Sequence, residues 1–379
     1  MKSVKKILIL PNNNQKNQID FWIRRCKYLY NVALEEKIEY YRHKKKYLNL
    51  YDQKKELVEI KDYDPSWKEI PNKSLTDVIF RLDIAFKSFF KKTNCGFPKY
   101  KNNDNYNSVY FVKEDVRNID NKLYLPKIKT HLKYKETLPD KYSGVELVKE
   151  NNKYYLCFCI EIPSAIKPIN INDNIGIDLG LKTLMTDNEG NKINRFSLKL
   201  FNNYQKRIKD LNKSLSTKRK GSIQRKKVKK QLNKTHKRLA NTRKDFLHKV
   251  STKYIKNNLN NRLIIGDIKV NSIIANSYTM KNATKKSKKG LRKNFYNSSL
   301  SELKNMFKYK GIKFGCNIEF VNERNTSKTC SCCHHIKSDL KLSDRVLKCD
   351  YCKTNIDRDI NAAINIRDVW LGQFKSISA

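Results

Sequence analysis

Two Cys-x-x-Cys pairs lie near the end of the chain, with fifteen residues between them: Cys330, Cys333, Cys349 and Cys352. Thiolates at this spacing can surround one tetrahedral Zn²⁺, and two short loops close such a site without a large hydrophobic core. The spacing therefore predicts a zinc ribbon over residues 326–356. Cys332, His334 and His335 lie beside the second cysteine and compete with Cys333 for its place as a ligand.

Two aspartates lie in patterns suited to divalent cations. Asp178 is the centre of the strand-like Gly176–Gly180, and Asp359 lies at the start of a predicted helix, where free backbone amides stabilise negative charge. Phosphodiester cleavage by two metal ions needs carboxylates that hold two Mg²⁺ about 4 Å apart. We interpret the glycines beside Asp178 as room for a nucleic-acid backbone. A turn acid at 178 and a helix N-cap at 359 are the alternative roles, and Asp357 competes with Asp359.

Size and charge narrow the classes of partner. A chain of 379 residues usually forms two or three domains. Lys and Arg number 81 against 37 acidic residues, a formal net charge of +44, which indicates a polyanionic partner, with nucleic acid ahead of a membrane surface or a ribosome-like scaffold. No apolar run approaches the roughly eighteen residues of a membrane-spanning helix. The ten cysteines show no disulfide framework, which predicts a reducing, intracellular location, cytoplasmic or nucleoid-associated.

The first half of the chain predicts helices followed by short strands. A first strand is expected within residues 1–15. Apolar residues recur at helical spacing over 17–60 and 66–92, so residues 16–95 are expected to be mostly helical. Short runs of β-formers follow, which predicts a small β-barrel or sheet over residues 96–170, completed by the first strand.

The second half, residues 171–379, predicts an α/β domain. Three strands between 174 and 196 form an antiparallel meander, and further strands are expected at 262–270 and 314–323. Helices are expected at 300–309 and from about 359, whereas 273–290 is polar and loop-like. This order, with the zinc ribbon inserted before the last helix, is that of a ribonuclease-H-like domain.

A strongly basic segment interrupts this domain. Residues 203–256 contain 20 Lys or Arg and only two acidic residues, with a break at Gly221-Ser222, which predicts two long basic helices joined by a turn. A solvated face is the alternative to a phosphate-facing role. The predicted nucleic-acid contacts gather at the turn: Lys218, Arg219, Lys220, Arg225, Lys226, Lys227, Lys229 and Lys230.

These motifs together resemble the TnpB, or OrfB, family of transposon-encoded proteins, relatives of type V CRISPR effectors. Tyr28–Asn31, Gly96–Tyr100 and Asn241–Lys249 also resemble family positions in family order. The resemblance implies a RuvC-type nuclease domain with an inserted zinc ribbon, preceded by a helical recognition lobe and a wedge-like β-barrel. It further implies a guide RNA from the transposon end, two catalytic Mg²⁺ and RNA-guided cutting of double-stranded DNA.

One departure from the family concerns the third metal ligand. The family usually places a Glu where this chain has Gly266, and glycine has no side chain with which to bind a metal. Asp267 can replace it only through a bulge, because neighbouring strand residues face opposite sides. Glu323 is the better candidate, because it ends the adjacent predicted strand and its longer side chain can supply the missing oxygen from the neighbouring position. This arrangement resembles a rearranged active site of some family members and of their eukaryotic relatives, the Fanzor proteins. A surface salt bridge to Arg324 is the alternative role of Glu323. We therefore expect Asp178, Glu323 and Asp359 to hold the Mg²⁺ ions.

Two other functions remain open. If the site is decayed, the chain is a nuclease-inactive, RNA-guided DNA-binding repressor. A transposase that performs strand transfer itself is the third hypothesis, although no tyrosine or serine recombinase signature accompanies the motifs.

Overall fold

The computed structural model divides the chain into two compact units, Met1–Ile162 and Pro163–Ala379, which are described one at a time. The ends of two predicted segments, 92–95 and 374–379, lie outside the described residues. The structure describes residues 2–91, 96–103, 105–120, 122–163, 165–168, 170–279, 284–340 and 344–373.

The helices of the first unit are α1 (Asn13–Lys44), α2 (Leu50–Tyr63) and α3 (Asn72–Phe90), which confirms the predicted helical spacing. The side chain of Asn12 accepts a hydrogen bond from the Gln15 backbone, and the Gln15 side chain accepts one from the Asn12 backbone, each at 2.9 Å. This reciprocal cap fixes the start of α1. Lys45, with φ of 52°, ends it.

An antiparallel sheet completes the first unit, in the order β2 (Ser108–Val112), β6 (Gly144–Glu150), β7 (Lys153–Glu161), β1 (Lys2–Leu10) and β5 (Lys133–Tyr134). The first strand of the chain pairs with β7 from Lys2 to Ile9, as predicted. A separate hairpin joins β3 (Arg117–Ile119) to β4 (Lys122–Tyr124). Helices and sheet share one hydrophobic core, in which the rings of Trp22 and Phe111 meet edge to face.

The sheet of the second unit has the order β10 (Lys192–Asn194), β9 (Thr183–Asp187), β8 (Asn174–Asp178), β11 (Arg262–Gly266) and β12 (Asn317–Val321). β8, β9 and β10 form the predicted antiparallel meander, and β8, β11 and β12 run parallel. Leu263, Ile264 and Ile265 of the interior strand β11 are fully buried, as expected for a parallel strand covered on both faces. This topology confirms the ribonuclease-H-like α/β fold.

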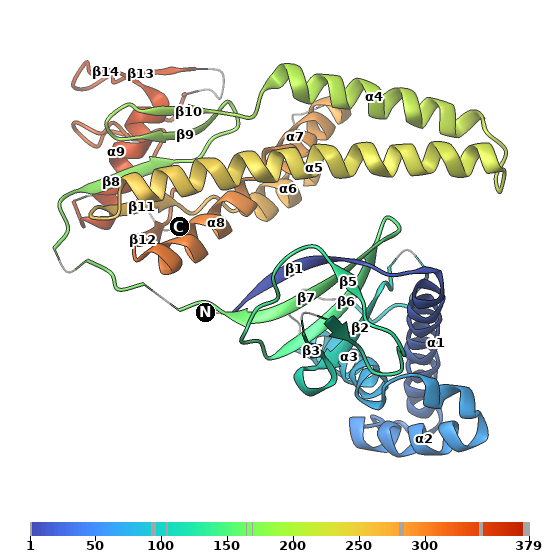
Figure 1. The fold of residues 1–379 in the computed structure, drawn as a ribbon. Helices are drawn as coiled ribbons and strands as arrows, with labels where there is room; N and C mark the ends of the chain where they lie inside the picture. Colours follow the sequence, from blue (N-terminus) through green and yellow to red (C-terminus); the bar gives the residue numbers. More distant parts are fainter. Residues whose placement is uncertain are drawn as a thin grey trace. The chain divides into compact units, whose positions relative to one another are not determined.

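The basic segment forms the predicted helical pair, α4 (Leu198–Thr217) and α5 (Ile223–Asn257), which lie side by side in Figure 1. Gly221 has a φ of 87°, a conformation that favours glycine, and the Ser222 side chain caps α5 by accepting from the Arg225 amide. Ile208, Leu232 and Leu239 form a small apolar cluster between the two helices. The pair is therefore held together by its own core.

The prediction of a loop over residues 273–290 is wrong for the residues that the structure describes. Residues 273–279 lie in α6 (Val270–Thr279) and residues 285–290 in α7 (Lys285–Ser298), which precedes α8 (Leu300–Phe314), whereas 280–283 lie outside the described residues. The Thr284 side chain caps α7 by accepting from the Ser287 amide at 3.1 Å, and Phe295 is buried. A short apolar face anchors an otherwise polar, Lys-rich helix, so polarity alone was a misleading signal.

The last helix, α9 (Arg358–Trp370), packs against β8. A Cβ atom added at Gly176 would lie 2.0 Å from the Ala363 carbonyl oxygen, and one at Gly180 would lie 2.7 Å from the Thr183 carbonyl oxygen. The glycines beside Asp178 therefore make room for the protein's own backbone, which corrects our interpretation that they admit nucleic acid. A small hairpin, β13 (Val346–Lys348) and β14 (Asn355–Asp357), precedes α9.

Candidate functional site

Four cysteine sulfurs lie within 4.8 Å of one another: Cys330, Cys333, Cys349 and Cys352. Two of the Sγ–Sγ distances are 3.6 Å and 3.5 Å. A zinc–sulfur bond of about 2.3 Å in tetrahedral geometry gives sulfur–sulfur edges of about 3.8 Å, so the cluster fits Zn²⁺. Cys332 is exposed and outside the cluster, and His335 stacks on Tyr351, so Cys333 is the second sulfur.

Hydrogen bonds orient this cluster and connect it to the last helix. The Thr354 hydroxyl lies 3.1 Å from Cys352 Sγ and lowers the pKa of that thiol to about 6. The buried Asn361 side chain donates to the Thr329 carbonyl at 2.7 Å and accepts from the Ser331 amide at 2.8 Å. Asn365, one turn further along α9, also donates to Thr329 at 2.7 Å. The spacing of these asparagines by four residues is a sequence signal for this contact that the predictions did not use.

Asp178 and Asp359 come from neighbouring elements. Asp178 is the last residue of β8, and Asp359 lies in the first turn of α9, which packs on that strand. The competing Asp357 has another role: it caps α9 by accepting from the Asp359 and Ile360 amides, and it pairs with Lys192 at 2.6 Å. Asp359 is therefore the acid of this pair whose carboxylate is not used as the helix cap.

Glu323 occupies the space beside Gly266. In the parallel register Gly266 pairs with Val321, so Glu323 follows two residues beyond the end of β12. A Cβ atom added at Gly266 would lie 2.5 Å from Glu323 Oε2 and 3.2 Å from Glu323 Cβ. The absence of a side chain at 266 thus leaves room for the carboxylate of Glu323.

The alternatives to Glu323 are held elsewhere. Asp267 forms an ion pair with Lys304 of α8, and the β11–β12 register is regular through Gly266, without the bulge that Asp267 would require. Within the described part of the chain, no ion pair joins Glu323 to Arg324. Glu323 Oε2 is instead buried without a hydrogen-bond partner among these residues. A buried carboxylate oxygen is normally hydrogen-bonded, so this one is a candidate to accept from a water or to bind an ion.

The three acids interact electrostatically. Burial, followed by the charges of Glu323 and Asp359, raises the pKa of Asp178 to about 8. Burial also raises the pKa of Glu323 to about 7, against the opposing charge of Lys304. Oxygen donors that repel one another suit a hard cation such as Mg²⁺, which would reverse these shifts. Among the described residues the four cysteines are the group whose ligand atoms lie within 4.8 Å of one another, and the three acids form no such compact group.

The predicted nucleic-acid contacts lie around the turn between α4 and α5. Arg225 has a structural role there: its guanidinium donates to the carbonyl of Lys218 at 3.0 Å and to that of Leu215. The other seven are exposed: Lys218, Arg219, Lys220, Lys226, Lys227, Lys229 and Lys230. Among the described residues, no helix combines the length and apolar character needed to cross a lipid bilayer.

Three family models match successive parts of the chain. They are described as a helix-turn-helix domain of OrfB_IS605 over residues 1–46, "Probable transposase" (OrfB_IS605) over 157–277, and the Cas12f1-like TNB domain over 301–366. The third match spans β12, the cysteine cluster and the start of α9, so it contains both the thiols and two of the acids described above.

Known proteins are similar to most of the chain. "Putative RNA-guided DNA endonuclease InsQ" of Escherichia coli K12 is 26% identical over 371 residues, covering 95% of this chain and 90% of the relative. "TnpB-like protein L79" of Acanthamoeba polyphaga mimivirus is 31% identical, covering 62% of this chain and 44% of the relative. A solved Cas12f1–sgRNA–target DNA complex is 18% identical, covering 97% of this chain and 99% of that one, with a TM-score of 0.36.

Proposed function

We propose that the chain, which is similar to TnpB-like proteins and matches the OrfB_IS605 family models, is an RNA-guided, Mg²⁺-dependent DNA endonuclease. Asp178, Glu323 and Asp359 are the proposed metal ligands. The four-cysteine cluster would hold a structural Zn²⁺. The proposed partners are a guide RNA derived from the transposon end and a double-stranded DNA target, inside the cell.

The observation that carries this proposal is the fit between Gly266 and Glu323. A decayed site has no reason to keep a buried carboxylate oxygen without a hydrogen-bond donor, because leaving it so costs free energy. In this chain Glu323 Oε2 lies in that position, next to the space that a side chain at 266 would fill. Relocation of the third acid to Glu323 would account for this cost.

The proposed roles follow from the positions of the acids. Asp178, whose pKa responds to both other acids, would bridge two metal ions, and Glu323 and Asp359 would each complete one of them. Two bound Mg²⁺ ions supply an activated water and stabilise the leaving oxygen of the scissile phosphate. Asp357 holds the first turn of α9 and thereby positions Asp359.

Cleavage of a target plasmid tests the proposal. The protein is purified with the RNA that copurifies with it, and a plasmid carrying the sequence complementary to the guide segment of that RNA is added with Mg²⁺. Asp178→Ala and Glu323→Ala should abolish nicking while RNA binding stays intact, and Asp267→Ala should retain nicking. Nicking that survives Glu323→Ala but is lost in Asp267→Ala would move the third ligand to Asp267.

The same assay separates the alternative functions. Wild-type protein that protects the target from other nucleases, yet never nicks it, would favour the RNA-guided repressor. DNA joining by the protein alone would favour a strand-transfer transposase.

A further inference from the structure

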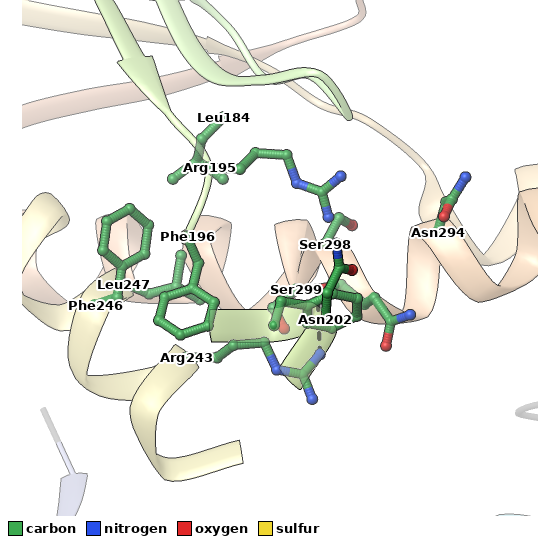
Figure 2. A pocket seen from close by; sticks show the side chains of 12 residues that line it. Leu184, Arg195, Phe196, Asn202, Arg243, Phe246, Leu247, Asn294, Ser298 and Ser299 are labelled. Carbon is green, nitrogen blue, oxygen red and sulfur yellow. Dashed lines mark hydrogen bonds between the residues drawn. The ribbon is translucent and has the colours of Figure 1, made fainter. Parts of the chain in front are cut away.

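The second unit contains a pocket that none of the three acids lines. Its volume is about 220 Å³, and it is enclosed by the start of α4, the middle of α5, the end of α7 and residue 184 of β9. We call it the two-arginine pocket; Figure 2 shows its lining residues. They are Leu184, Arg195, Phe196, Phe201, Asn202, Arg243, Phe246, Leu247, Asn294, Asn297, Ser298 and Ser299.

Two arginines line this pocket, and none of its lining residues is acidic. Arg195 donates to the Leu181 carbonyl at 2.5 Å, and Arg243 donates to the Asn297 carbonyl at 3.2 Å. Figure 2 shows both side chains among the lining residues. Neither arginine forms an ion pair with an acid among the described residues. The positive charge in the pocket is therefore not neutralised by a direct contact.

One donor of a lining arginine has no partner. Arg243 Nε is buried and forms no hydrogen bond within the described part of the chain. Burial and then the charge of Arg243 lower the pKa of Arg195, and burial lowers the pKa of Arg243 against the nearby Glu302. A buried guanidinium donor is normally paired, and its planar fork matches the oxygens of a phosphate. These arginines thus present the pattern of an anion site without its anion.

The rest of the lining suits a group attached to that anion. The rings of Phe196 and Phe246 lie with centroids 5.9 Å apart, beside the guanidinium groups. Aromatic faces provide surfaces on which a sugar or a base can pack. The volume is below the roughly 300 Å³ at which pockets for drug-sized ligands begin, so it fits a single phosphate and its immediate neighbour rather than a free dinucleotide.

We propose that the two-arginine pocket binds one phosphate group of a nucleic-acid strand, with Arg195 and Arg243 on its oxygens and Phe196 and Phe246 against the attached nucleoside. This inference rests on the proposed function for the identity of the polyanion. It adds a defined contact to the diffuse basic surface of α4 and α5. The strand is either the guide RNA or the target DNA, which share this chemistry.

Salt-dependent binding tests the pocket. The probes are the labelled RNA that copurifies with the protein and a labelled DNA duplex that carries its target, added to the protein–RNA complex. Arg195→Met/Arg243→Met should weaken binding of one probe at least tenfold. The slope of log affinity against log salt should become shallower by about 0.7 for each single-strand phosphate that the variant no longer neutralises, or by about 0.9 for each duplex phosphate.

Two further variants make the result specific. Arg195→Lys/Arg243→Lys should keep the wild-type slope but lose affinity several-fold, because an ammonium cannot form the two-pronged contact of a guanidinium. Arg238→Met/Lys244→Met removes two charges of α5 outside the pocket lining and should weaken binding less than the paired pocket variant. Circular dichroism and the midpoint of thermal unfolding confirm that each variant is folded.

The outcomes separate the two proposals. A decrease in affinity confined to the RNA probe, or to the DNA probe, supports the pocket and identifies the strand. If wild-type protein binds both probes and the Met pocket variant matches it, or weakens no more than the α5 variant, the pocket inference is overturned while the proposed function stands. Wild-type protein that binds neither probe overturns both. A wild type that binds but does not nick removes only the nuclease activity.

Discussion

The cysteine cluster comes from the single segment 330–352, whereas the acidic cluster is drawn from distant parts of the chain, and the two are organised in opposite ways. The four sulfurs lie within 4.8 Å of one another, and Thr354 and a pair of asparagines orient the loops around them. The three acids form no such compact group, and a carboxylate oxygen of Glu323 lacks a hydrogen-bond partner among the described residues.

The roles proposed for the two metals would account for this difference. A structural Zn²⁺ needs four ligands that close around it, and its affinity is part of the folding free energy. Catalytic ions must leave coordination positions for water and the scissile phosphate, so their ligands cannot close. The protein therefore tolerates unsatisfied buried charge at the acids and not at the thiols. Substitutions at the two clusters can test this contrast, from the largest expected effect to the smallest.

Removal of the bridging acid should have the largest effect. Asp178→Asn keeps the shape of the side chain but removes the charge expected to hold both ions, so we expect nicking to fall by at least about a thousandfold, comparable to loss of a principal electrostatic group. The rate of plasmid nicking in Mg²⁺ measures this loss.

The same variant should unfold at a higher temperature than wild type in EDTA, because it removes one of three mutually repelling acids. A lower unfolding temperature would contradict the proposed repulsion.

Loss of a thiol should open the closed site. Cys349→Ser removes one of four ligands to an ion whose binding contributes on the order of 10 kcal/mol in small zinc domains. We expect zinc content to fall from one ion per chain to near zero, measured by atomic emission. Nicking should also fall, because the ribbon contacts α9 through Asn361 and thereby supports Asp359. Cys332→Ser is the matched control and should retain zinc, since this thiol is exposed.

A single methyl group should disturb the acidic site. Gly266→Ala places a Cβ atom 2.5 Å from Glu323 Oε2 and 3.0 Å from the Ile366 side chain, so the carboxylate must move. We expect nicking to decrease by about ten- to a hundredfold, in line with a misplacement of about 1 Å. Gly266→Glu/Glu323→Ala moves the acid to the family's usual position and should recover activity relative to Glu323→Ala. Unchanged nicking in Gly266→Ala would separate Glu323 from catalysis.

A buried lysine provides the test with the smallest expected effect. Its charge is buried but, unlike the Glu323 oxygen, it has hydrogen-bond partners. Lys310 Nζ donates to the His248 carbonyl, Ser251 and Thr252 at 2.7–2.8 Å, and burial followed by Lys313 lowers its pKa to about 8. An unfolded lysine keeps its proton to about pH 10.4. Between these values the unfolded state binds more protons, so stability attributable to Lys310 rises with pH.

The measurement is urea denaturation of wild type and Lys310→Met at pH 7.5 and pH 10. The free energy of unfolding of wild type should rise relative to that of Lys310→Met between pH 7.5 and pH 10, by on the order of 1–3 kcal/mol. A constant difference would show that Lys310 titrates alike in both states.

Local patterns in the sequence were reliable guides to structure. The spacing of the cysteines, the break at Gly221-Ser222 and the strand containing Asp178 each depend on a few neighbouring residues, and each lies where expected. The order of strands was also predictable, because it follows from the succession of elements.

Features that depend on contacts between distant segments were harder to predict. Glu323 was only one of several candidates, because the β11–β12 register that places it beside Gly266 is not visible in either strand alone. α6 and α7 were missed because their polar residues hide a narrow apolar face. The alternation of Val145 and Leu147 in β6 was a usable signal for a strand that the predictions did not include. The two-arginine pocket joins three helices and had no local signal.

The most direct test of the central claim is to locate the ions. A crystal of the protein–RNA complex grown with Mn²⁺ in place of Mg²⁺ would reveal them by anomalous scattering. We predict two peaks about 4 Å apart, both contacted by Asp178, with Glu323 Oε2 on one and Asp359 on the other. Peaks held by Asp267 instead, or no Mn²⁺ at Glu323 while its carboxylate keeps its position beside Gly266, would contradict the relocated acid.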